Sequence, residues 1–94
     1  MTGHTVLLYE STPGRRRYLQ TVSEKAALQF LLEMLSRQLS GKQVSLSDCM
    51  NFIASFEDIG LMVLDEPSGM FKPHGRDYLT DRLIKHLASF TDLV

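Results

Sequence analysis

Two short stretches of the chain carry hydrophobic residues without the polar alternation of a half-exposed strand. Thr5–Tyr9 lies near the amino terminus, and Leu61–Leu64 lies past the middle of the chain. A strand with one face in water alternates apolar and polar residues, whereas an unbroken apolar run is typical of a strand covered on both faces. The pattern therefore predicts a sheet that is dry on both sides.

Each of these stretches is followed by turn residues and a second, more polar strand. The turn Glu10–Gly14 leads to a strand over Arg15–Val22, whose arginine run at its start is typical of a sheet edge. The segment Asp65–Gly69 contains a proline and a glycine, which favour a turn. Pro73 is expected to end the strand that follows. The sequence thus predicts two hairpins.

The helix expected between Ser23, its N-cap, and Leu39 carries more hydrophobic surface than one sheet contact needs. Ala27, Phe30 and Met34 lie on a second flank of this helix. That flank either packs against a neighbouring helix or forms a groove for a partner peptide, because apolar patches on soluble proteins mark contact sites. The residues of the main stripe, which is expected to face the sheet, are Leu28, Leu31, Leu32, Leu35 and Leu39.

Two further helices are predicted from the spacing of hydrophobic residues. One begins after an N-cap at Ser45 or Ser47 and is expected to end at Gly60, and the other begins near Arg76. Cys49 lies in the buried stripe of the first, where a core residue is a better interpretation than a nucleophile. The two stripes are Cys49, Phe52, Ile53, Phe56 and Ile59, and Leu79, Leu83, Leu87 and Phe90.

These elements predict a single α+β domain over residues 1–94, in the order ββααββα. Three amphipathic helices cover one face of a four-stranded antiparallel sheet, and nothing remains for the other face. Val6 and Leu8 would be exposed there with either Met62 or Leu61 and Val63, and we take Leu61 and Val63 as the prediction. A second copy of the sheet is the simplest cover, so a sheet-to-sheet homodimer is expected.

Composition adds little to this picture and excludes some ligands. The 94 residues are 44% hydrophobic and 22% charged, with a formal net charge of −1. That balance gives no electrostatic reason to expect nucleic acid or an anionic membrane as the main ligand. A single cysteine favours a reducing compartment, and no apolar run approaches the ~20 residues needed to span a bilayer. We expect a nuclear or cytosolic protein without membrane contact.

No catalytic, metal or cofactor motif is recognisable. The histidines His4, His74 and His86 are not at metal-ligand spacing, and no nucleophile elbow or phosphate-binding loop occurs. The sequence therefore predicts a protein without catalytic activity, metal or cofactor.

Two alternative functions stay open beside a peptide-binding dimer. Direct RNA binding would use the arginines at 15–17 and Arg76 for phosphate, although the aromatics that single-strand binders stack on bases are not interleaved with them. A small dimeric α+β barrel enzyme also pairs sheets, but such folds usually alternate single strands and helices and need a polar pocket between the sheets.

Short matches spaced along almost the whole chain point to a family. They are His4–Leu8, Gly14–Arg15, Tyr18, Ser23, Ser47–Leu64, Phe71–Pro73 and Arg76–Leu79. Taken in order, they resemble the enhancer of rudimentary homolog family, with Tyr78 where a tryptophan is usual. No single match is diagnostic, whereas the ordered set is fairly specific.

The resemblance implies a small eukaryotic nuclear protein, with the cytoplasm as a second compartment, that has no catalytic activity. Family members are homodimers joined through their sheets, and Val6 and Leu8 match strand residues at that contact. They act as adaptors that bind peptide segments of transcription, splicing, RNA-processing or RNA-decay factors, and are connected with the cell cycle. The assignment of Ala27, Phe30 and Met34 to a partner groove comes from the helix plot, and the resemblance does not supply it.

The chain also departs from the family pattern. The loop between the first two helices is shortened to Ser40–Gln43, and the first helix has large apolar residues where smaller ones are common, which changes the peptide that fits. The resemblance also implies phosphorylation by acid-directed kinases. Arg17 replaces one such hydroxyl, and Thr21, followed by Glu24 three residues on, is the candidate phosphosite.

Overall fold

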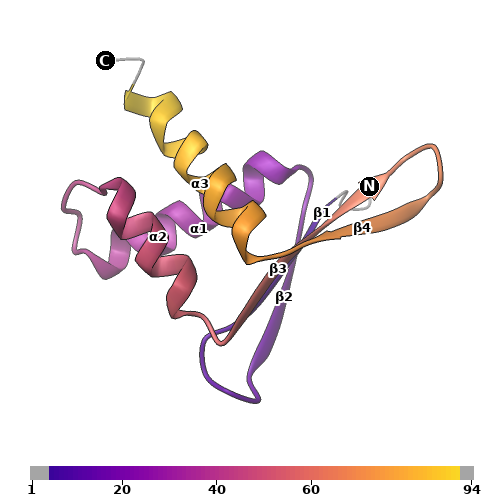
Figure 1. Ribbon diagram of the computed structural model, residues 1–94, viewed down its shortest axis with the longest axis horizontal. Coiled ribbons are helices and arrows are strands. Elements are labelled where there is room, and N and C mark those ends of the chain that lie inside the picture. The colour runs from indigo at the N-terminus through magenta and orange to yellow at the C-terminus, as the bar shows by residue number, and fades with distance from the viewer. Residues whose placement is uncertain (1–4, 92–94) are drawn as a thin grey trace.

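Four strands and three helices follow one another in the predicted order ββααββα. The computed structural model describes the backbone of residues 5–91 and the side chains of residues 5–89. The three helices lie on one side of an antiparallel sheet (Figure 1), which confirms the predicted α+β fold. The elements are β1 (Thr5–Glu10), β2 (Arg16–Thr21), α1 (Glu24–Gln38), α2 (Leu46–Ser55), β3 (Asp58–Asp65), β4 (Met70–His74) and α3 (Arg76–Thr91).

The two unbroken apolar stretches form the two central strands of the sheet. The strand order is β2-β1-β3-β4, and all neighbours are antiparallel. The register of β1 and β3 places Leu7 opposite Leu61 and Leu8 opposite Gly60. The polar strand β2 lies at one edge, as its arginine run predicts. At the other edge β4 continues through Pro73 to His74, because an edge strand tolerates a residue without an N–H donor.

The core lies between the helices and one face of the sheet. Leu7 and Leu61 supply the sheet side of it and are 0% and 1% exposed. Each helix contributes most of its predicted stripe, and burial of these side chains is the main stabilising term of the fold. Leu32, Leu39 and Leu87 are partly buried and pack against the core, and the predicted stripe residue Phe90 lies outside the described side chains. The buried hydrophobic residues are Leu7, Ala27, Leu28, Leu31, Leu35, Cys49, Phe52, Ile53, Phe56, Ile59, Leu61, Leu79 and Leu83.

The first two helices begin at the serine caps expected from the sequence. The Ser23 hydroxyl oxygen accepts the N–H of Ala26 at 3.1 Å. The cap of α2 is Ser45 rather than Ser47: its hydroxyl accepts the N–H of Asp48 at 3.1 Å, and the Asp48 carboxylate accepts the Ser45 N–H at 2.9 Å. This reciprocal capping box lowers the pKa of Asp48, since its bonds with Ser45 favour the charged carboxylate.

The prediction that α2 runs to Gly60 is wrong. The helix ends at Ser55, and Ile59 belongs to β3, where it pairs with Tyr9. The spacing of Ile59 satisfies both a helix stripe and a buried strand position, so only pairing with β1 decides between them. The Glu57 N–H already donates to the Glu10 carbonyl oxygen at 2.7 Å, which draws the chain out of the helix.

One arginine of α3 closes the carboxyl end of α2. The Arg76 guanidinium donates to four backbone carbonyl oxygens, at distances of 2.8 to 3.3 Å. The last carbonyls of a helix lack partners within it and carry partial negative charge, so a guanidinium is a suitable donor there. The acceptors are the carbonyls of Ile53, Ala54, Phe56 and Glu57.

Candidate interaction surfaces

No helix covers the second face of the sheet, which we call the open face. Side chains alternate along a strand, so Val6 and Leu8 point away from the buried Leu7, and Met62 and Leu64 point away from Leu61. The register adds aromatic residues from both edges, because Tyr18 lies opposite Leu8 and Phe71 opposite Leu64. Tyr18 is 61% exposed and Phe71 42%. The apolar residues that the register places on the open face are Val6, Leu8, Tyr18, Met62, Leu64, Phe71 and Pro73.

The structure corrects half of the predicted dimer interface. Val6 and Leu8 lie on the open face, as predicted, whereas Leu61 and Val63 lie on the face that the helices cover. Leu61 is buried and Val63 packs against the core. Four apolar residues in a row carry no polar alternation, so the sequence did not reveal which pair points outward. Met62, the alternative considered from the sequence, is on the open face.

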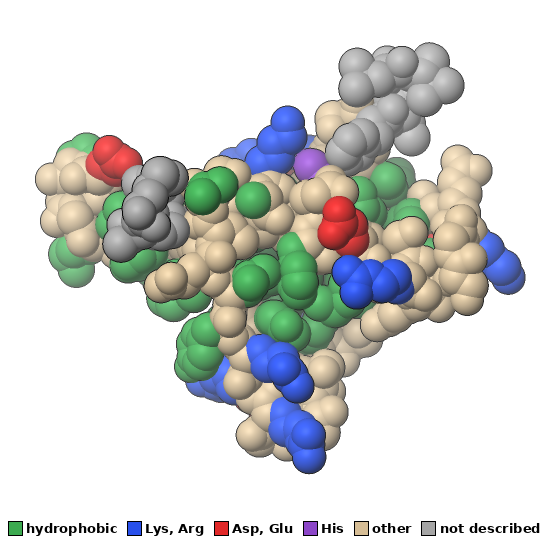
Figure 2. Space-filling model, turned by 180° about the vertical axis from the view of Figure 1, so that it is seen from behind, with side chains coloured by type: hydrophobic (Ala, Val, Ile, Leu, Met, Phe, Trp, Pro, Cys, Tyr) green, Lys and Arg blue, Asp and Glu red, His purple; other side chains and the backbone are tan. Residues whose placement is uncertain are grey.

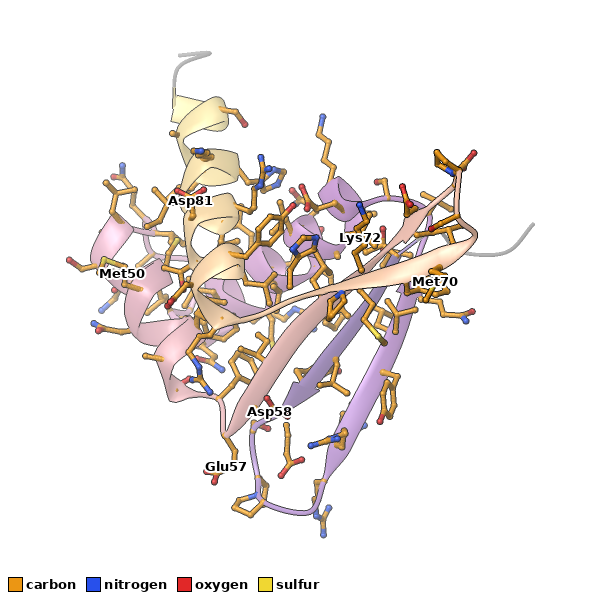
Figure 3. All side chains as sticks on the ribbon, turned by 45° about the vertical axis from the view of Figure 1, so that its right-hand side comes forward. Met50, Glu57, Asp58, Met70, Lys72 and Asp81 are labelled. Atoms are coloured by element: carbon orange, nitrogen blue, oxygen red, sulfur yellow. The ribbon has the colours of Figure 1, made fainter. Side chains whose placement is uncertain are left out.

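A charged group borders the open face at one end. Arg16 is 3.3 Å from Glu10 (Nε to Oε1) and 3.0 Å from Asp58 (Nη2 to Oδ2). Figure 3 shows Asp58 at the start of β3, beside the β1–β2 hairpin. An apolar area with a polar rim is the usual anatomy of a protein interface.

Two of the four basic residues proposed for RNA binding are engaged within the protein. Arg16 pairs with two carboxylates, and Arg76 is bonded to the end of α2. Arg15 and Arg17 remain as exposed residues at the hairpin. Seen from behind, hydrophobic side chains gather in the middle of the molecule and basic side chains at its lower end, where the β1–β2 hairpin lies (Figure 2). The structure thus does not assemble these four arginines into one basic surface.

The predicted groove on α1 is only partly present. Ala27 is 0% exposed and lies in the core, so its assignment to a groove is wrong. It lies one residue before Leu28 in the helix, and both fall within the arc that α1 buries. Phe30 and Met34 are half-buried and pack against the core. The Phe30 ring lies 6.0 Å from the Tyr9 ring, so this flank extends the contact of α1 with the sheet.

The candidate phosphosite lies at the junction of β2 and α1. The Thr21 hydroxyl is half-buried and donates to the Ser23 carbonyl oxygen at 2.7 Å. Modification of this hydroxyl would break that bond next to the cap of α1.

A polar cluster that the sequence did not predict joins β4, α1 and α3. The Tyr78 ring stacks on His74 with centroids 4.0 Å apart, and the Arg82 guanidinium lies 5.0 Å above the Tyr78 centroid. The Tyr78 hydroxyl donates to the Glu24 carboxylate, which raises the pKa of Tyr78 because the bond stabilises the protonated phenol. These contacts hold helix α3 against the start of α1.

A hollow lies on the helical side of the molecule, between α2 and α3. Its volume is about 420 Å³. Met50 and Asp81, on opposite walls, are on the side of the helices that faces away from the sheet (Figure 3). Its lining residues are Met50, Ala54, Arg76, Asp77, Thr80, Asp81 and Ile84.

Within residues 5–89, no three His, Cys, Asp or Glu side chains come together in a way that could hold a metal ion. Among the described helices, none is long and apolar enough to cross a membrane. Cys49 is buried, and burial raises the pKa of its thiol, as expected of a core residue.

The fold and its surfaces define a class of protein: a two-layer α+β domain whose sheet keeps one apolar face uncovered. The family model of Enhancer of rudimentary matches residues 1–92 of the 94-residue chain. The chain belongs to the Enhancer of rudimentary family, which confirms the resemblance found in the sequence. This family is not a known enzyme family. A comparison with curated proteins found no match.

Proposed function

We propose that the protein is a non-catalytic homodimeric adaptor of the nucleus. It binds peptide segments of transcription, splicing, RNA-processing or RNA-decay factors. The observation that carries the proposal is the open face, an apolar sheet surface for which the described chain has no cover. The nuclear setting and the kind of partner follow from what resemblance to the family implies.

Burial by a second copy is the simplest way to remove the open face from water. Val6, Leu8 and Met62 are flanked by the exposed rings of Tyr18 and Phe71, so the apolar area is continuous across all four strands. Large apolar patches on soluble proteins mark contact sites, and two-fold self-association is the commonest oligomer. The same surface packs against itself in the dimer.

Partner peptides would bind along the flank of α1, on the side of the sheet that the helices cover. Phe30 and Met34 are half-buried there, so they offer apolar area without needing a rearrangement of the core. Phe30 contacts Tyr9, which shares a face of β1 with the buried Leu7. Binding to this flank is therefore compatible with a dimer that is joined through the open face.

Sedimentation velocity at micromolar concentration tests the dimer. The wild-type protein should sediment with twice the mass of the chain, and Leu8→Arg should sediment as a folded monomer. Leu46→Arg is the matched control, because Leu46 is 52% exposed on α2, away from the sheet. A wild-type monomer, or a Leu8→Arg dimer, would contradict the proposal.

Affinity capture from nuclear extract, with and without RNase, tests the adaptor role. RNA-processing or transcription factors should stay bound after RNase treatment, and a Phe30→Ser, Met34→Ser double variant should lose them. Loss of every partner on RNase treatment would instead favour the alternative of direct RNA binding through Arg15 and Arg17.

A further inference from the structure

The hollow between α2 and α3, which we call the helical groove, is a separate surface with its own chemistry. Its lining includes the apolar side chains of Met50 and Ala54 from α2 and Ile84 from α3. Neither the open face nor the flank of α1 contributes to its lining. Each protomer therefore carries a complete groove whether or not it dimerises.

Exposed hydrophobic residues extend the groove along α2. Leu46, Met50 and Ala54 are spaced by four residues, so they lie on one side of the helix, and Leu46 and Met50 are 52% and 54% exposed. This stripe is distinct from the buried stripe of Cys49 and Phe52. Exposed methionine adapts to different apolar partners and is common at peptide-binding surfaces.

The charged lining residues, Arg76, Asp77 and Asp81, have a formal net charge of −1, and Lys85, which pairs with Asp81, is not part of the lining. The Arg76 guanidinium is bonded to the carbonyls that end α2, and the Thr80 hydroxyl donates to the Arg76 carbonyl oxygen at 2.9 Å. Asp77 has no side-chain hydrogen bond or ion pair within the described part of the chain. Asp81 pairs with Lys85 at 3.2 Å. This ion pair is exposed, so replacing Lys85 by a cation of a partner costs little free energy.

We propose that the helical groove binds a basic amphipathic helix of a partner protein. Leucine or methionine side chains of that helix would lie beside Met50, Ala54 and Ile84, and its arginine or lysine residues would pair with Asp77 and Asp81. The complementarity in both hydrophobicity and charge favours this occupant over an acidic or purely polar segment. The proposal is independent of the dimer and adds a second docking surface to the adaptor.

The probe is a synthetic amphipathic helix of about four turns, made of alanine, leucine and arginine, with the leucines on one side. Amide chemical shifts of the isotope-labelled protein are followed during its titration. Saturable changes are expected along α2 and α3 around the groove. A matched peptide with glutamate in place of arginine should bind at least about tenfold more weakly.

Two variants locate the contact. Ala54→Trp places a large side chain in the groove from an exposed position. It should lower the affinity for the probe peptide by more than about tenfold. Asp81→Asn should lower the affinity for the probe peptide by about two- to fivefold and reduce the salt dependence of binding. Glu33→Gln, which removes an exposed carboxylate of α1 outside the groove, is the matched control and should leave affinity unchanged.

Three outcomes would overturn the proposal. These are shift changes centred on β1 and β3, equal binding of the glutamate peptide, and an unchanged affinity of Ala54→Trp. A lower sedimenting mass of Ala54→Trp would show that a second copy occupies the groove, which also contradicts it. Leu8→Arg, which tests the dimer, should bind the probe like the wild type, so the two proposals fail separately.

Discussion

The two faces of the sheet have nearly the same hydrophobic character and opposite surroundings. Leu7 is fully buried by the protein's own helices, whereas its neighbour Leu8 lies on the open face. The same alternation separates Leu61 from Met62 on β3. Burial of the first face is intramolecular and stabilises the fold at any dilution, whereas burial of the second requires another molecule. The contrast predicts that the covered face contributes to the stability of the single chain, whereas the open face contributes to the stability of a complex.

The largest effect is expected from a cavity on the covered face. Leu7→Ala should lower the free energy of unfolding by about 2–5 kcal/mol, because removed methyl groups leave a space that the core cannot refill. Urea denaturation measures the loss, which should not depend on protein concentration at dilutions where the protein is monomeric. Leu8→Ala is the control on the open face. An equal loss for Leu8→Ala in the dilute monomer would remove the distinction between the faces.

A charge on the open face should abolish the proposed self-association without unfolding the chain. Met62→Asp should raise the dimer dissociation constant by more than about a hundredfold, because an unpaired carboxylate would be buried in the contact. The thermal midpoint, which rises with concentration for a dimer, should then become independent of concentration.

Met70→Asp is the matched control for that experiment. Met70 is 67% exposed at the tip of the β3–β4 hairpin (Figure 3), so the same substitution there should leave the concentration dependence intact. Loss of the dependence in both variants would indicate a general effect of charge.

Removal of the arginine that closes α2 should destabilise the covered side by an intermediate amount. Arg76→Ala should cost about 1–3 kcal/mol of unfolding free energy, because half-buried carbonyls at the end of α2 lose a charged donor. Arg76→Lys should recover only part of it, since one ammonium does not reach all four acceptors. Urea denaturation gives the loss, and faster amide exchange near Ser55 would locate it. Full recovery of the unfolding free energy in Arg76→Lys would contradict a contribution from all four guanidinium hydrogen bonds.

The smallest effect concerns pH and lies within the helical layer. Burial, with a smaller contribution from Lys25, lowers the pKa of His86. The unfolded chain therefore binds a proton more readily than the folded one, so this contribution to stability is present above the ordinary histidine pKa and is lost as pH falls below it. The thermal midpoint should decline between pH 7.5 and 6, and less so in His86→Gln. An unchanged decline in that variant would assign it to other groups.

Most of the helices and strands were predictable from the sequence, and each wrong prediction has an identifiable cause. The serine caps at Ser23 and Ser45 and the leucine spacing of α1 are local signals, so they were legible without the structure. The end of α2 was misplaced because Ile59 fits a helix stripe and a strand equally well. Ala27 was assigned to the wrong side of α1 because a plot of one helix does not show how wide an arc its neighbours bury.

The sequence by itself determined the order of elements, their caps, the hydrophobic surplus and the absence of a recognisable catalytic motif, since all of these depend on residues close together in the chain. Only the tertiary structure decided that Met62 rather than Leu61 lies on the open face. It also decided that the Arg76 guanidinium donates to the end of α2, and that α2 and α3 form a groove whose lining includes two carboxylates. Each of these depends on the register or packing of distant segments, which pattern along the chain does not encode.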